Sequence, residues 1–206
     1  MKRTLAFAAS LLLLGACSSD GYTIRGKIAG LDNPYVYLLR YTGEVEVIDS
    51  AKVTKGDFVF KGKAEQPEVV YLSTDKQQPF VHFFLENGRI SVDGALSAPA
   101  DIAVLGTPSN DIQRAFDEKI AALEEEFAKT GNDVQRDSLR KEYSKLMSDA
   151  VEMNRDNIYG VTTFLNNAYA FLSPEEVMEQ IALFPAEWQQ RRELTELREA
   201  TNASSA

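Results

Sequence analysis

The chain has 206 residues, 44% of them hydrophobic, which is enough for one domain with a substantial core or for two small domains. Its 22 basic and 31 acidic residues give a formal net charge of −9, and an acidic surface repels the phosphates of DNA and RNA, which argues against nucleic-acid binding. With a single cysteine, the chain cannot be a disulfide-stapled scaffold and has no CxxC redox centre.

The first sixteen residues have the composition of a secretory signal peptide. Lys2 and Arg3 give a positive start, and residues 4–14 carry no charge. This apolar run is too short to cross a bilayer, which takes about 20 apolar residues. We therefore expect residues 1–16 to be removed during secretion, which leaves 20 basic residues against 31 acidic ones and a net charge of −11.

The run Leu14-Gly15-Ala16-Cys17 resembles the lipobox of bacterial lipoproteins. That resemblance implies cleavage between Ala16 and Cys17 and a diacylglycerol on the Cys17 thiol. Several acyl chains on one residue give a stable membrane anchor, because each buried methylene contributes about 0.8 kcal/mol. We therefore expect Cys17 to be the site of lipid attachment.

Residues 17–21 are small and polar, which is typical of a flexible tether. Ser18, directly after the cysteine, resembles the sorting signal of lipoproteins that are sent to the outer membrane. The single acid Asp20 gives little support for export to the cell surface. We expect the mature chain to lie in the cell envelope, lipid-anchored to the outer membrane, with the periplasmic face favoured over the cell surface.

Residues 22–107 alternate between apolar and polar with period two, which is typical of antiparallel strands separated by turns. The strands are predicted at residues 22–28, 35–39, 45–53, 58–62, 69–73, 80–85, 89–92 and 102–105. Eight short strands of this kind predict an antiparallel β-sandwich or a partly open barrel.

Residues 108–200 change to a helical period, so the predicted fold class is α+β, with an α-helical domain after the β domain. The first helix is predicted to begin at a Ser109 cap and to end at a Gly131 C-cap. Ser173 opens a capping box with Pro174 at the first helical position. The other helices are predicted at 133–157, 162–172 and 185–200, and residues 201–206 are predicted to be a flexible tail.

Six different short patterns follow one another along the β half. They are Ile24-x-Gly26, Val36-Tyr37-Leu38, Ile48-Asp49-Ser50-Ala51, Gly56-x-Phe58-x-Phe60-x-Gly62, Phe84-Leu85-Glu86-Asn87-Gly88, and Gly106 before Asn110. Together they resemble the N-terminal domain of unknown function in thioredoxin-like envelope lipoproteins of the thiol:disulfide interchange and AhpC/TSA types. In those proteins a helical segment and then a thioredoxin fold follow the β domain.

The resemblance implies no catalytic residue in this domain. The sequence continues through the helical segment, and we expect it to have no thioredoxin domain. Because it also has no CxxC motif, we expect it not to act as a thiol oxidoreductase by itself. Residues 106–109 match neither phosphate-binding glycine pattern and are interpreted as a hinge between sheet and helices. We expect no enzyme activity, no catalytic residue, no metal and no cofactor.

His82 is the single histidine, within an apolar strand. A zinc site needs three or four ligands, and a catalytic base needs an orienting partner, so the structural interpretation of His82 is favoured. An enzyme built around His82 is the last of the alternatives.

Tyr35 and Tyr37 lie two residues apart and therefore share one face of their strand. If that face is inward, both belong to the core; if it is outward, they form a patch suited to a partner protein or a sugar. The leading hypothesis is a non-catalytic, lipid-anchored binding module for another envelope protein, with a thioredoxin-like lipoprotein as candidate. The alternative is a lipoprotein of an uptake system that binds a small ligand or a glycan.

Overall fold

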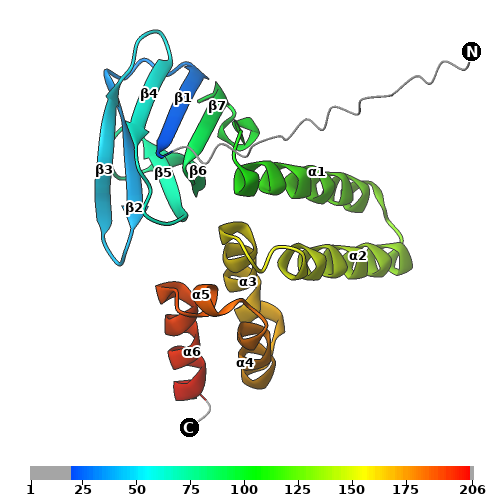
Figure 1. The fold of residues 1–206 in the computed structure, drawn as a ribbon. Helices are drawn as coiled ribbons and strands as arrows, with labels where there is room; N and C mark the ends of the chain where they lie inside the picture. Colours follow the sequence, from blue (N-terminus) through cyan, green and yellow to red (C-terminus); the bar gives the residue numbers. More distant parts are fainter. Residues whose placement is uncertain (1–19, 205–206) are drawn as a thin grey trace, which may run out of the picture.

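A computed structural model describes residues 20–204, apart from the side chains of residues 168–171. It confirms the predicted α+β fold: two four-stranded sheets are followed by helices, and the sheets do not close into a barrel (Figure 1). The predicted signal peptide, residues 1–16, and the predicted lipid site Cys17 lie outside the described residues. The strands are Tyr22–Ala29 (β1), Tyr35–Tyr41 (β2), Val45–Lys52 (β3), Asp57–Gly62 (β4), Glu68–Ser73 (β5), Pro79–Leu85 (β6), Gly88–Ala95 (β7) and Ala103–Leu105 (β8).

The strand order is β4-β1-β7-β8 in one sheet and β3-β2-β5-β6 in the other. Five of the six strand pairs are antiparallel, but β1 and β7 pair in parallel, so the expectation of purely antiparallel strands is wrong at this pair. Between β1 and β7 the chain builds the whole second sheet. Alternation within one strand fixes which side chains face inward, but it does not fix the direction of a partner that is distant in the sequence.

The inner faces of the two sheets enclose one apolar core. Its buried members include Ile24, Leu38, Phe60 and Phe83, each at most 1% exposed. Gly26 belongs to this packing, because a Cβ built on it would lie 1.9 Å from the Cζ of Phe58. Gly26 and the phenylalanines of the Gly56–Gly62 pattern therefore pack together in the core of the sandwich.

The helices are Pro108–Lys129 (α1), Asp133–Glu152 (α2), Ile158–Phe171 (α3), Pro174–Ala182 (α4), Ala186–Gln189 (α5) and Arg192–Ser204 (α6), and Pro99–Asp101 forms one short 3-10 turn. The Ser173 capping box is confirmed. The second helix ends at Glu152 and not at 157, and Asn157 instead accepts a hydrogen bond from the Gly160 N–H of α3 at 3.1 Å.

Three further helix predictions need correction. Ser109 does not cap α1, because it lies inside the helix, with Thr107 at the cap position. The C-cap of α1 is Thr130 in an extended conformation, so Gly131 does not fill that position. The predicted helix 185–200 is divided into α5 and α6, and α6 continues to Ser204, where the buried Thr201 hydroxyl donates to the Leu197 carbonyl at 2.7 Å.

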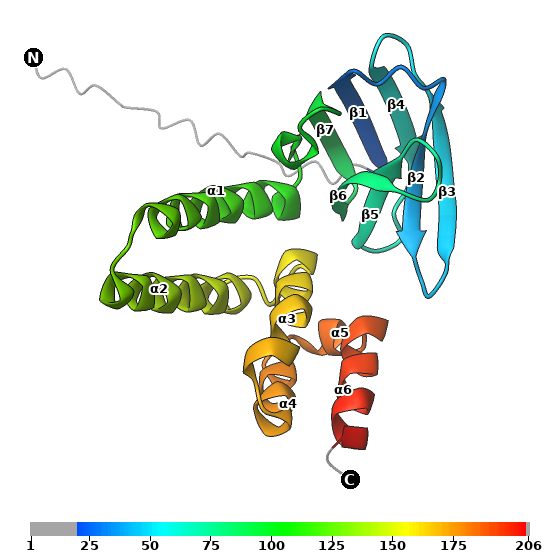
Figure 2. The ribbon, with the colours of Figure 1, turned by 180° about the vertical axis from the view of Figure 1, so that it is seen from behind.

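The helices pack on the outer face of the β3-β2-β5-β6 sheet, at its β5–β6 side. Phe84 and Val69 of this sheet meet Phe116 of α1 and Tyr159 of α3 in one apolar cluster. A second cluster joins α3, α4 and α6. Figures 1 and 2 show α1 and α2 as an antiparallel pair that extends away from the sandwich. Within residues 20–204 no helix is both long and apolar enough to span a membrane.

Candidate functional site

Tyr35 and Tyr37 both lie on the outer face of the β3-β2-β5-β6 sheet, because Val36 and Leu38 between and beside them point into the core. Tyr35 is 47% exposed. Tyr37 is half-buried, and the Lys76 Nζ lies 4.6 Å from its ring centroid. The structure therefore brings the two predicted residues to one outward face, with Tyr35 as the more accessible side chain.

The neighbouring strand adds residues that the sequence did not single out. Val45 lies opposite Tyr41, and Val47 lies opposite Leu39, so both valines share the outer face with the tyrosines. Val45, Val47 and Tyr41 are 45%, 43% and 40% exposed. We call this surface the tyrosine–valine face, and its members are Tyr35, Tyr37, Tyr41, Val45 and Val47.

One edge of the tyrosine–valine face meets the helices at a small cleft. The Tyr41 ring lies edge-on to the Tyr71 ring, with centroids 4.7 Å apart. Both tyrosines line a cleft of about 180 Å³ against α3 and α6. Arg40 and Glu68 also line this cleft, and the Arg40 Nε lies 3.2 Å from the Glu68 Oε2. Burial raises the pKa of Glu68, an effect that Arg40 partly offsets. The cleft is smaller than the roughly 300–1,000 Å³ of usual small-molecule sites.

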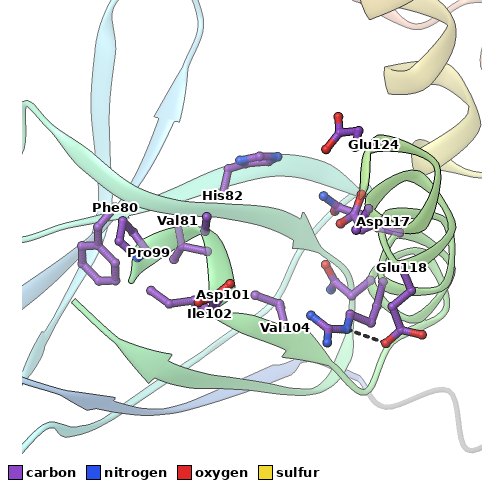
Figure 3. A pocket seen from close by; sticks show the side chains of 15 residues that line it. Phe80, Val81, His82, Pro99, Asp101, Ile102, Val104, Asp117, Glu118 and Glu124 are labelled. Carbon is purple, nitrogen blue, oxygen red and sulfur yellow. Dashed lines mark hydrogen bonds and ion pairs between the residues drawn. The ribbon is translucent and has the colours of Figure 1, made fainter. Parts of the chain in front are cut away.

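A larger groove of about 770 Å³ lies between β6, the 3-10 turn and α1 (Figure 3). It contains the single histidine of the chain. His82 is exposed, and Figure 3 shows it across the groove from Asp117 of α1. Desolvation raises the pKa of Asp117, and the nearby His82 and Arg114 partly offset that rise. Asp117 is nevertheless an exposed residue.

The groove carries more acid than base. Asp101, Asp117, Glu118 and Glu124 line it, and Arg114 pairs with Glu118 at 2.9 Å. Within the described residues no hydrogen bond joins His82 to Asp117, and no group of three or more acidic, histidine or cysteine side chains could hold a metal ion. The arrangement therefore offers His82 a nearby carboxylate but no orienting hydrogen bond.

Asn110 fixes the end of this groove. Its Oδ1 accepts from the Phe84 N–H at 2.9 Å, and its Nδ2 donates to the Phe84 carbonyl at 2.8 Å and to the Thr107 hydroxyl at 2.7 Å. The side-chain amide thus satisfies the free edge of β6 as a neighbouring strand would. Asn110 is 1% exposed, so this joint between α1 and the sheet is buried.

Residues 106–109, interpreted from the sequence as a hinge, connect β8 to α1 and are held by close backbone packing and hydrogen bonds. Gly106 has a φ of +102°, where a side chain would be strained, and a Cβ there would lie 2.3 Å from the Arg89 carbonyl oxygen. The Glu86 carboxylate accepts from the Ser109 N–H at 3.1 Å and from its hydroxyl at 2.7 Å. A carboxylate therefore already occupies an N–H group that a phosphate would need at this helix start.

Residues 22–113 match the model of a protein family described as "Domain of unknown function (DUF4369)". The matched segment contains all eight strands and the first residues of α1, including Asn110. It agrees with the predicted N-terminal domain of unknown function. No characterised protein and no solved structure matched the chain.

Proposed function

We propose that the chain is a lipid-anchored lipoprotein of the cell envelope and a non-catalytic binding module for another envelope protein. The observation that carries this proposal is the tyrosine–valine face. Tyr35, Tyr41, Val45 and Val47 are all at least 40% exposed and lie on two adjacent strands. Exposed apolar side chains that gather on one face are typical of a surface that another protein covers.

The chemistry of this face suits a protein partner. Tyrosine is enriched at interfaces because its ring is apolar and its hydroxyl group can still bind a polar group. Exposed charged residues lie beside the apolar centre, namely Glu44 next to Val45, Lys52 opposite Tyr35 and Lys76 over the Tyr37 ring. An apolar centre with a charged rim is the usual arrangement of a protein–protein interface.

The partner we favour is a thioredoxin-like envelope protein. The proteins that this chain resembles carry a thioredoxin fold after the β domain and the helical segment. This chain would then supply the β domain in trans to a separate redox protein. With the anchor on Cys17, both partners would meet at the periplasmic face of the outer membrane.

The alternative function, binding of a small ligand or glycan for uptake, is supported by the cleft beside Tyr41 and Tyr71. Its volume of about 180 Å³ is closer to that of a single small sugar ring than to that of an extended glycan. A thermal shift with one class of compound, lost in Tyr71→Ala, would favour this alternative over the protein-binding function.

Site-specific photocrosslinking in the native envelope tests the proposal. The crosslinking side chain is placed at Val47 in the lipidated full chain, and a matched control places it at Val59, which is 48% exposed on the outer face of the other sheet. We expect crosslinks from Val47, but not from Val59, to one protein with a thioredoxin fold identified by mass spectrometry. Equal crosslinking from both positions, or none from Val47, would overturn the proposal.

Two variants connect the crosslink to the tyrosines and to the anchor. In a chain that carries the probe at Val47, Tyr35→Ala/Tyr37→Ala should abolish the crosslink while far-UV and near-UV circular dichroism stay unchanged. Loss of folding in that variant would instead assign the two tyrosines to the stability of the sheet. Cys17→Ser should remove the acyl mass and release the chain from the membrane fraction.

A further inference from the structure

The outer face of the β4-β1-β7-β8 sheet carries a cluster of positive charge. The strand register places Lys61 and Arg89 on either side of Thr23, and Arg25 lies two residues further along β1 on the same face. We call Arg25, Lys61 and Arg89 the cationic face. All three are exposed and line a hollow of about 700 Å³.

The charges of the cationic face are not neutralised by neighbours. None of the eight residues that line the hollow is acidic. Asp111, whose carboxylate accepts a hydrogen bond from the Gly106 N–H at 2.7 Å, is not among them. None of the ion pairs in the described part of the chain involves Arg25, Lys61 or Arg89. On a chain with a net charge of −9, such a cluster indicates an anionic ligand.

The cationic face lies at the end of the sheet where the tether enters. Tyr22 opens β1 and pairs with Gly62 of β4 and Gly88 of β7, and the next row along the strands is Lys61, Thr23 and Arg89. Four residues lie between Cys17 and Tyr22, and the five Cα–Cα steps of an extended tether reach at most about 18 Å. At the opposite end of the same face the register places two acids, Asp57 and Asp93, on either side of Lys27.

We propose that the cationic face docks on the anionic phospholipid headgroups of the membrane that carries the Cys17 anchor. The proposal rests on the proposed lipid anchor, which would hold this end of the sheet within reach of the headgroups. Each basic residue near an anionic surface favours the docked orientation by about fivefold. Docking would turn the tyrosine–valine face, which lies on the opposite side of the sandwich, away from the membrane and toward a partner.

Acetylation of surface lysines on vesicles tests this orientation. The mature chain with a free Cys17 thiol is coupled to a maleimide lipid in vesicles of phosphatidylcholine, with or without phosphatidylglycerol. Lys61 reports on the cationic face, and Lys52, exposed on the outer face of the other sheet, is the matched control. We expect phosphatidylglycerol to lower acetylation of Lys61 at least about fivefold, with little change at Lys52.

High salt and Arg25→Gln/Arg89→Gln should both restore acetylation of Lys61, because they weaken the attraction to the headgroups. Equal protection of both lysines, or protection without phosphatidylglycerol, would overturn the proposal. Protection of Lys61 by inorganic phosphate without vesicles would assign the face to a soluble phosphate ligand instead.

The coupled chain separates this proposal from the anchor itself. Chemical coupling holds the chain on the vesicle whether or not cells lipidate Cys17. Mass spectrometry of the chain from its native envelope tests lipidation alone. Protection of Lys61 on vesicles together with an unmodified native Cys17 would overturn the anchor and leave a membrane-binding face.

Discussion

The two sheets share one core but differ on their outer faces. The β3-β2-β5-β6 sheet presents the tyrosine–valine face at one side and holds the helices at the other, through Phe84 and Val69. Within residues 20–204, the apolar clusters that join helices to the sandwich contain no residue of the β4-β1-β7-β8 sheet, whose outer face is charged. The outer face of one sheet is therefore apolar and partly covered by helices, whereas the outer face of the other carries exposed charged side chains.

The largest expected effect is a loss of stability when an apolar side chain is removed from the outer face that holds the helices. Phe84 is 3% exposed and contacts Tyr159 edge-on, with ring centroids 6.1 Å apart. Phe84→Ala should lower the free energy of unfolding by about 3–5 kcal/mol, because it leaves a cavity between sheet and helices. Chemical denaturation followed by circular dichroism measures this change.

Val59→Ala is the matched control on the other sheet, because its side chain is exposed and packs on no helix. Its free energy of unfolding should stay within about 0.5 kcal/mol of the parent. Comparable losses in the two variants would show that the outer faces do not differ in the way described.

The second prediction concerns the hydrogen bonds by which Asn110 of α1 binds the edge of β6. Asn110→Ala leaves the Phe84 N–H and carbonyl without their partners. An unsatisfied buried group costs about 1–3 kcal/mol, and two such groups at the low end of that range give an expected loss of about 2–3 kcal/mol. Hydrogen exchange should accelerate at the Phe84 amide.

Asn132→Ala provides the comparison for this joint. Asn132 caps α2 far from the sheets and accepts from the Val134 N–H at 2.9 Å. Its loss should cost about 1 kcal/mol and leave exchange at Phe84 unchanged. Equal effects of the two substitutions on the Phe84 amide would contradict the role assigned to Asn110.

The sequence predicted the strands well because alternation is a local property. Each predicted strand from 22–28 to 102–105 has a counterpart in the structure, and the bounds differ by a few residues. The parallel pairing of β1 with β7 and the Asn110 joint were missed, because each depends on residues far apart in the sequence. Asn110 and Phe84 are 26 residues apart, and no local period records that contact.

The same reason limited the prediction of the candidate site. The spacing of Tyr35 and Tyr37 placed them on one face, but Val45 and Val47 join them only through the register of β2 with β3. The cationic face needs three strands, since Arg25, Lys61 and Arg89 belong to β1, β4 and β7. The net charge of −9 is a sum over the whole chain, so it does not reveal a local cluster of positive charge.

The third prediction concerns the ring contact between Tyr41 and Tyr71, at the edge of the tyrosine–valine face that meets the helices. Tyr41 and Tyr71 are in edge contact, with centroids 4.7 Å apart. A double-mutant cycle with Tyr41→Ala and Tyr71→Ala should give a coupling of about 0.5–1.5 kcal/mol, because edge-on ring pairs add to simple burial. A cycle of Tyr71→Ala with Val59→Ala should be additive, and a coupling of zero in the first cycle would remove the contact as a support of the face.

The smallest expected effect is a pH dependence in the groove between β6 and α1. Reduced solvation raises the pKa of Asp117 in the folded chain, with partial compensation by His82 and Arg114. The folded chain therefore binds this proton more tightly than the unfolded chain, so this contribution to stability is present at low pH and is lost as the pH rises through the raised pKa. Asp117→Asn should consequently raise the melting temperature relative to the parent more at pH 7 than at pH 3.5.

Asp75→Asn should show the opposite sign and serves as the control. N–H groups of Gln78 and Gln77, followed by the Ser73 hydroxyl, donate to the Asp75 carboxylate and lower its pKa. Its contribution to stability is therefore present at neutral pH and lost as the pH falls, so the variant should lose most at pH 7. Melting curves across this range compare the two variants directly. If the melting-temperature differences of both variants changed in the same direction with pH, the raised pKa of Asp117 could not be their cause.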